Sequence, residues 1–263
     1  MDHLLTRRAL LSGILPFIFV AGRRLPLDAA SQETAYRLEV GILFGLISYE
    51  IKGRVIEEID RAAERYRVRI DGDGTGISTH MDVSGIIRGG RFVPVRTRNA
   101  QTLRGRENRL AIDYDYERGR IEYHSVGYTF FLGRRRQVDD TVAIPKDGPI
   151  DDAVSACLNF AADRLERAPD GSYRTRVVRR SRPENEGPDD VSPDGYRIEI
   201  VPFAFKTEEE PGTGRLHAKI DLTRWSTWAR SSKPAVLTFR RDRRIESVDS
   251  PMILGSRAML RLG

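Results

Sequence analysis

The chain has 263 residues, of which 40% are hydrophobic and 31% are charged, so it can bury a sizeable core and is not a disordered protein. Its 44 basic and 38 acidic residues leave a formal charge of +6. Because most arginines lie within a few residues of Asp or Glu, the pattern indicates a charge-mixed surface and excludes nucleic acid as an expected partner.

The N-terminal segment predicts export. Arg7 and Arg8 precede an uncharged apolar run over residues 9–22. This run is shorter than the ~20 apolar residues of a transmembrane helix, but it is typical of a secretory signal. The paired arginines resemble a twin-arginine signature, so that route and the general secretory route both stay open. We predict a signal over 1–30 and a periplasmic mature chain with no transmembrane span. The alternative is an inner-membrane anchor formed by an uncleaved N-terminus.

Apolar residues then alternate with a period of two. In the run 65–71, Tyr66, Val68 and Ile70 face one side and three arginines face the other, which predicts a half-buried strand. The run 110–116 repeats this alternation. Further strands are predicted at 36–40, 46–51, 121–123, 173–178, 196–201, 216–222, 236–240, 245–248 and 258–262. The short connection that holds Gly119 predicts a hairpin, and many short strands are typical of a barrel or a sandwich.

One helix is predicted over residues 149–165. Pro149 suits the first turn, and Asp151 and Asp152 suit the positive end of the helix dipole. An apolar stripe follows at helical spacing, formed by Ile150, Val154, Leu158, Ala161 and Leu165. This stripe predicts that the helix packs against the sheet.

Two later segments have simple interpretations. The stretch 179–195 is rich in Pro, Asp, Glu and Gly, which predicts a flexible surface loop. Trp225 and Trp228 lie three residues apart, and we expect them to pack a short helical turn against the core. An aromatic face for a ligand or a membrane interface is the alternative.

No residue pattern predicts a catalytic, metal or cofactor site. The segment 71–82 superficially fits a calcium loop, but it ends in Asp rather than Glu and follows a strand, so we expect a β-turn. Cys157 is the only cysteine and lies in an apolar run, which predicts an inert thiol. His80, His124 and His217 lack the spacing of paired metal ligands. A hydrolase would need His124 or His217 beside a carboxylate in a cleft.

Several segments together resemble the bacterial DUF3108 family. They are 47–55, 66–68, 89–94, 112–115 and 145–152, and the resemblance covers roughly residues 36–165. It implies an exported protein with a half-closed antiparallel barrel, similar to periplasmic lipoprotein carriers, in which a curved sheet wraps a helix and shelters an apolar cavity. It supplies no catalytic residues.

We therefore predict a mainly β fold in which residues 31–263 form a single domain, with one curved antiparallel sheet making a half-open barrel around the helix. The favoured function is non-enzymatic binding of a lipid or another hydrophobic envelope ligand. The predicted cavity lining is Val68, Ile70, Ile112, Tyr114, Val154 and Leu158. The first alternative is a fully packed structural or interaction protein of the envelope, and the second is a hydrolase.

Overall fold

The computed structural model describes residues 30–103, 105–129, 132–183, 186–229 and 232–263. Apart from Ala30, the predicted export segment lies outside them. The described residues form a mainly β structure with one α-helix, α1 (Ala153–Ala161), and a short 3-10 turn, η2 (Ile253–Gly255). No helix among them is both long enough and apolar enough to span a membrane.

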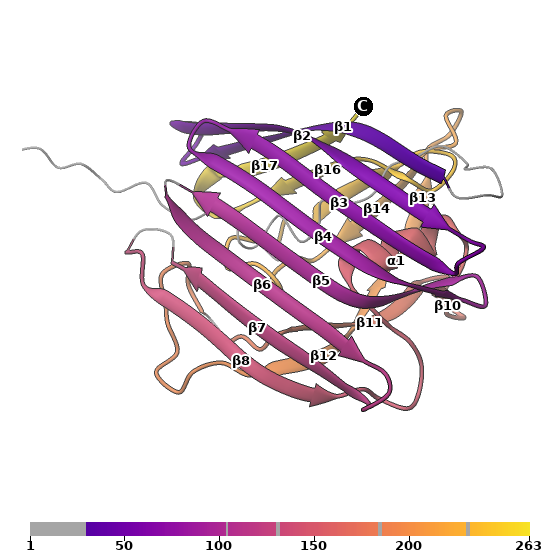
Figure 1. Ribbon diagram of the computed structural model, residues 1–263. Coiled ribbons are helices and arrows are strands. Elements are labelled where there is room, and N and C mark those ends of the chain that lie inside the picture. Colours follow the sequence, from indigo (N-terminus) through magenta and orange to yellow (C-terminus); the bar gives the residue numbers. More distant parts are fainter. Residues whose placement is uncertain (1–29, 104, 130–131, 184–185, 230–231) are drawn as a thin grey trace, which may run out of the picture.

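A large antiparallel sheet dominates the molecule (Figure 1). Its thirteen strands follow the order β13-β14-β15-β16-β17-β1-β2-β3-β4-β5-β6-β7-β8. Their bounds are β1 Ala30–Ile42, β2 Ile47–Asp60, β3 Arg65–Gly74, β4 Ile77–Arg88, β5 Arg91–Leu103, β6 Arg106–Asp115, β7 Arg120–Tyr128, β8 Arg135–Ala143, β13 Thr207–Glu209, β14 Leu216–Ile220, β15 Ala235–Phe239, β16 Ile245–Pro251 and β17 Arg257–Leu262. Strands β17 and β1 pair antiparallel, which brings the C-terminal strand beside the first one.

A second, small sheet lies between the two edges of the large one. It consists of β10 (Glu166–Arg167), β11 (Tyr173–Arg180) and β12 (Ile198–Phe205), and β9 (Ile150–Asp151) pairs parallel to β11. The Ile198 N–H donates to Asp140 Oδ2 of edge strand β8 at 2.9 Å, and β12 leads directly into the opposite edge strand, β13. The prediction of one curved sheet is therefore corrected to two sheets. The large one is curved, as predicted, but is not closed into a barrel.

Helix α1 lies inside the curve of the large sheet and is shorter than predicted (Figure 1). It begins at Ala153 because Asp152 caps it: the Asp152 carboxylate accepts from the Ser155 N–H, and the Ser155 side chain accepts from the Asp152 N–H. Residues 150–151, expected in the first turn, form β9 instead. The helix ends at Ala161, two residues before Asp163, whose backbone adopts a positive φ of 58°.

The other predicted segments are largely confirmed. All eleven predicted strands are present, and the predicted hairpin joins β6 to β7 across Gly119. The calcium-like segment 71–82 is the β3–β4 hairpin, which turns at Gly76 with a φ of 71°. In the predicted loop 179–195, residues 181–183 and 186–195 lie outside strands and helices, whereas Arg179 and Arg180 belong to the end of β11. Trp228 is buried in the core as predicted, although its segment forms turns rather than a helix.

Glycines in two strands make room for buried tyrosines. A Cβ on Gly53 would lie 2.6 Å from the Tyr36 ring, and one on Gly85 would lie 2.5 Å from the Tyr66 ring. In both positions the added atom would also meet backbone of the neighbouring strand, at 2.0 and 2.1 Å respectively. The rings therefore lie flat against the sheet where a side chain would otherwise stand, which fits the use of strand glycines at close approaches.

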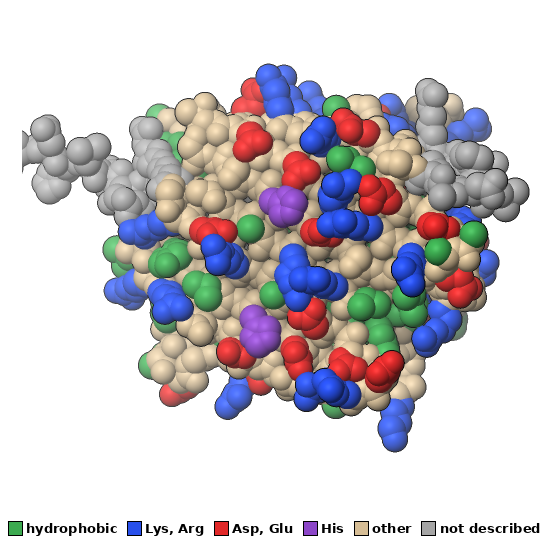
Figure 2. Space-filling view, viewed as in Figure 1, with side chains coloured by type: hydrophobic (Ala, Val, Ile, Leu, Met, Phe, Trp, Pro, Cys, Tyr) green, Lys and Arg blue, Asp and Glu red, His purple; other side chains and the backbone are tan. Residues whose placement is uncertain are grey.

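The outer face of the large sheet carries charges of both signs. Figure 2 shows blue and red side chains interleaved across this face. Cross-strand pairs account for part of the pattern: Arg69 lies 2.6 Å from Glu58, and Arg98 lies 2.6 Å from Asp113. The inner face, by contrast, holds the hydrophobic core, so that the period-two pattern separates the two faces.

Candidate functional site

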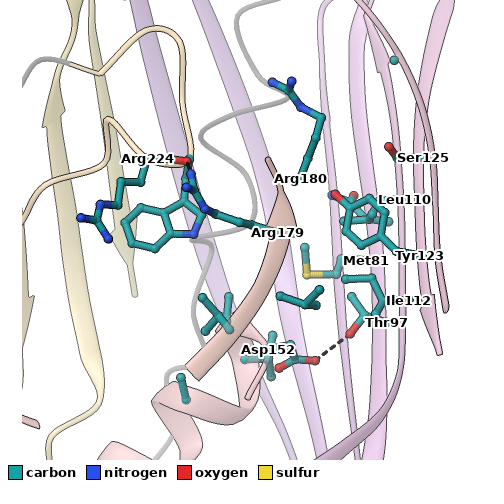
Figure 3. Close-up of a pocket in the computed structure, with 18 of the residues that line it drawn as sticks. Met81, Thr97, Leu110, Ile112, Tyr123, Ser125, Asp152, Arg179, Arg180 and Arg224 are labelled. Carbon is teal, nitrogen blue, oxygen red and sulfur yellow. Dashed lines mark hydrogen bonds between the residues drawn. The ribbon is translucent and has the colours of Figure 1, made fainter. Parts of the chain in front are cut away.

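A cavity of about 290 Å³ lies between the inner face of the large sheet, helix α1 and the small sheet (Figure 3). Strands β4 to β8 form one wall, and α1 with β11 and β12 forms the facing wall. Strands β14 and β15, together with the segment that holds Trp225 and Trp228, complete the lining. Most of these side chains are apolar, so the cavity is mainly a hydrophobic space.

The wall formed by the sheet is ordered in levels by the strand register. Thr97, Ile112 and Tyr123 are aligned across β5, β6 and β7. The next level toward the other end holds Asn99, Leu110 and Ser125. Beyond it Gln101 pairs with Asn108, and the Asn108 side chain lies beside Gly127. Strand β5 therefore supplies three inward polar side chains in a row, while β6 and β7 supply mostly apolar or small groups.

Some of the polar atoms in this wall have no partner within the described residues. Gln101 Oε1, Asn99 Oδ1 and the Tyr114 hydroxyl are all buried and form no hydrogen bond there. Gln101 is only 4% exposed, and burial raises the pKa of Tyr114 well above its ordinary value. A buried polar group normally has a partner, so these atoms are available to a bound molecule or to water.

A buried polar network holds the closed end of the cavity in place. The Asp151 carboxylate accepts from the Thr175 hydroxyl at 2.5 Å and from Asn159 Nδ2 at 2.9 Å, and it forms an ion pair with Arg91. Burial raises the pKa of Asp151 to about 6, against the opposing effect of the Arg91 charge. This network joins β9, β11, α1 and β5, so it fixes the helix against both sheets.

Asp152 borders the cavity itself. Its carboxylate accepts from the Thr97 hydroxyl at 2.7 Å, across the gap between the helix start and β5 (Figure 3). Burial raises its pKa, while hydrogen bonds from Ser155 and Thr97 act in the opposite direction. Because these partners orient both carboxylate oxygens, Asp152 is explained as a helix cap and a bridge to the sheet.

Arginines gather at the opposite end. Arg136, Arg179, Arg180, Arg182 and Arg224 all line the cavity, and Figure 3 shows three of them away from Asp152. Arg180 and Arg182 share one almost completely buried carboxylate, that of Glu186, with N–O distances of 2.7 and 3.2 Å. The cavity is thus polarised, with an apolar body and a cationic end.

The predicted lining residues are divided between the cavity and the core. Ile112, Tyr114 and Val154 line the cavity. Val68, Ile70 and Leu158 do not; they are buried elsewhere in the hydrophobic core. Periodicity identified inward-facing residues but could not separate those that fill the core from those that border a space.

The other sequence candidates lie in different surroundings. His80, His124 and His217 lie beside carboxylates at 2.5, 2.9 and 3.8 Å, but none of them lines the cavity. No group of three or more metal-ligating side chains occurs among the described residues. Cys157 does line the cavity, and burial raises the pKa of its thiol. The arginine end was missed because its members come from three segments that are far apart in the sequence.

The comparisons with known proteins leave the family open. No family model matches the chain, and no curated protein sequence matches it. Among solved structures, the chain is similar to the crystal structure of a beta-barrel-like protein of a domain of unknown function, DUF1849, from Brucella abortus. The identity is 10%, the TM-score is 0.40, and the match covers 90% of this chain and 96% of that one. The resemblance to DUF3108 stays a prediction.

Proposed function

We propose that this chain binds a small hydrophobic ligand in the cavity under the curved sheet and acts as a carrier or receptor rather than as an enzyme. The observation that carries the proposal is the cavity of about 290 Å³ itself. Protein interiors hold few voids larger than a water molecule, and ligand sites begin at ~300 Å³. Burial of apolar ligand surface would contribute ~25 cal/mol per Å².

Export and family membership belong to the same proposal. The N-terminal pattern around Arg7 and Arg8 supports delivery to the periplasm, where a hydrophobic ligand needs shelter from water. The DUF3108 resemblance supports the same setting. The alternative, a fully packed envelope protein, requires other groups to fill the cavity in solution.

Binding can be tested by filling the cavity. Ser125 lies on β7 and lines the cavity, whereas its neighbour His124 is exposed on the opposite face of the strand. We expect Ser125→Trp to reduce binding of the neutral apolar dye N-phenyl-1-naphthylamine at least tenfold, and the matched control His124→Trp to bind as the wild type does. Equal binding by wild type and Ser125→Trp, with both proteins folded, would contradict the proposal.

The single cysteine gives an independent measurement. Cys157 borders the cavity, and its raised pKa makes labelling by monobromobimane slow. Saturating dye should slow that labelling further, because a bound molecule covers the thiol. Unchanged labelling would place the dye elsewhere on the protein.

Export has its own test. In cell fractionation, the full-length precursor should yield a periplasmic product. Substitution of both Arg7 and Arg8 by Lys should block this if the twin-arginine route is used and should leave it unchanged if the general route is used. Retention of the wild-type precursor in the cytosol would contradict the proposed location.

A further inference from the structure

The arginine end of the cavity carries more positive charge than its partners neutralise. Five arginines, Arg136, Arg179, Arg180, Arg182 and Arg224, line the cavity at this end. Within ion-pairing distance of them, the described residues supply two carboxylates, Glu186 and Glu199. Among the described residues, the arginines at this end of the apolar space therefore outnumber the carboxylates that pair with them.

These cations are also partly removed from water. The side chains of Arg136, Arg179, Arg180 and Arg182 are only 15 to 18% exposed. Burial lowers the pKa of Arg179 and of Arg182, which shows the cost of holding the charge there. Buried cations of this kind are stabilised by an anionic partner.

Two donors at this end are free to contact a ligand. Arg179 Nε is buried and has no hydrogen-bond partner within the described residues. Arg224 is exposed and takes part in none of the ion pairs found among those residues. Arg179 donates to the Arg224 carbonyl oxygen, so the guanidinium group of Arg179 lies beside the backbone of Arg224.

The volume limits the apolar part of the ligand. The cavity of about 290 Å³ lies at the lower end of the ~300–1,000 Å³ typical of ligand sites, which favours one acyl chain over two. The buried acceptor Gln101 Oε1 lies in the wall and can bind a hydroxyl near the headgroup.

We infer that the ligand is a single-chain amphiphile with an anionic headgroup, held with its chain against the sheet and its headgroup among the arginines of β11 and of the segment around Arg224. This inference rests on the proposed function and specifies its ligand. The shared chemistry is one acyl chain and one anion, and it is met by a free fatty acid or by a lysophospholipid.

The experiment compares headgroups on one chain length. Dodecanoate, lauroyl lysophosphatidate and neutral dodecanol displace N-phenyl-1-naphthylamine from the wild type, and the two anions should bind at least tenfold more tightly than the alcohol. Their affinity should fall as NaCl rises from 0.02 to 0.5 M, whereas that of dodecanol should not. The tighter of the two anions identifies the headgroup, a carboxylate or a phosphate.

A charge-matched pair of variants locates the headgroup. Arg224→Gln should weaken dodecanoate about three- to tenfold and leave dodecanol unchanged. Arg261→Gln removes the same charge from an exposed position on β17 and should change neither affinity. Equal affinities of dodecanoate and dodecanol would overturn the anionic headgroup while leaving ligand binding intact. If the wild type binds neither the dye nor any of these chains, the proposed function fails as well.

Discussion

We predict that the Asn159 side chain of helix α1 makes a large contribution to the free energy of unfolding. It is completely buried and joins three groups: Oδ1 accepts from the Phe92 N–H at 2.8 Å, and Nδ2 donates to the Phe92 carbonyl oxygen at 2.8 Å and to Asp151 Oδ1 at 2.9 Å. Asn159→Leu keeps the branched shape and the number of side-chain heavy atoms and removes all three hydrogen bonds. The start of β5 then loses its attachment to the helix.

The size of the effect follows from those contacts. Each lost hydrogen bond contributes a net ~0.5–1.5 kcal/mol, and a buried backbone group left without a partner costs ~1–3 kcal/mol. We expect a loss of about 3–5 kcal/mol in the free energy of unfolding, a large share of the ~5–15 kcal/mol that a domain of this kind has. Urea denaturation followed by tryptophan fluorescence measures it.

A second buried amide provides the control. Gln101 is as deeply buried as a core residue, but its Oε1 has no partner among the described residues. Gln101→Leu should therefore change the free energy of unfolding by less than about 1 kcal/mol. If Asn159→Leu also costs less than about 1 kcal/mol, the hydrogen bonds do not hold the helix to the sheet and the reasoning is refuted.

Three further predictions concern stability. Gly85→Ala should lower the free energy of unfolding, measured by urea denaturation, by more than about 2 kcal/mol, because the new methyl group would overlap the Tyr66 ring and backbone. An unchanged free energy would contradict the close approach of the Tyr66 ring to Gly85. Asp151, with its pKa raised to about 6, should make the wild type lose about 2 kcal/mol of unfolding free energy relative to Asp151→Asn as pH rises from 4 to 6, since the carboxyl ionises first in the unfolded state; parallel pH profiles would exclude this. Arg244→Met should lower the free energy of unfolding by about 3–5 kcal/mol at pH 7, because it leaves the buried Glu57 carboxylate without its cation. This loss of stability should become smaller toward pH 4, where Glu57 takes up a proton. A loss that did not change with pH would show that Glu57 is not the cause.

The period-two pattern predicted most strands of the large sheet and missed two central ones, β4 and β5. In β4, Thr79 and Gly85 interrupt the apolar inner face. Strand β3 alternates Tyr66, Val68 and Ile70 with arginines, so its period of two is plain. Strand β5 places Thr97 and Gln101 on the inner face, so the contrast between its faces is weak. The polar residues that hide the strand from a periodicity analysis are the ones that border the cavity.

The site was only partly predictable for a related reason. The size of a cavity depends on the distance between its facing walls. In this molecule β9, the capped start of α1 and the small sheet set that distance. Strand β9 leaves no periodic pattern, because it spans two residues and pairs with a strand more than twenty residues away. Strands β11 and β12 were predicted from their sequences, but their separation into a second sheet was not. The arginines at the end of the cavity likewise become neighbours only in the folded chain, where β11 lies beside the segment around Arg224.

The free margin of the large sheet affects how the molecule behaves among its own copies. Strand β13 has three residues, and two of them, Glu208 and Glu209, are exposed acids. Unpaired backbone at a sheet margin invites another chain to add to it, and shortness and charge both discourage such addition. A second molecule that approached this edge would meet acidic side chains like its own and only three residues of backbone with which to pair. Strand-by-strand self-association of concentrated protein is therefore disfavoured at this edge.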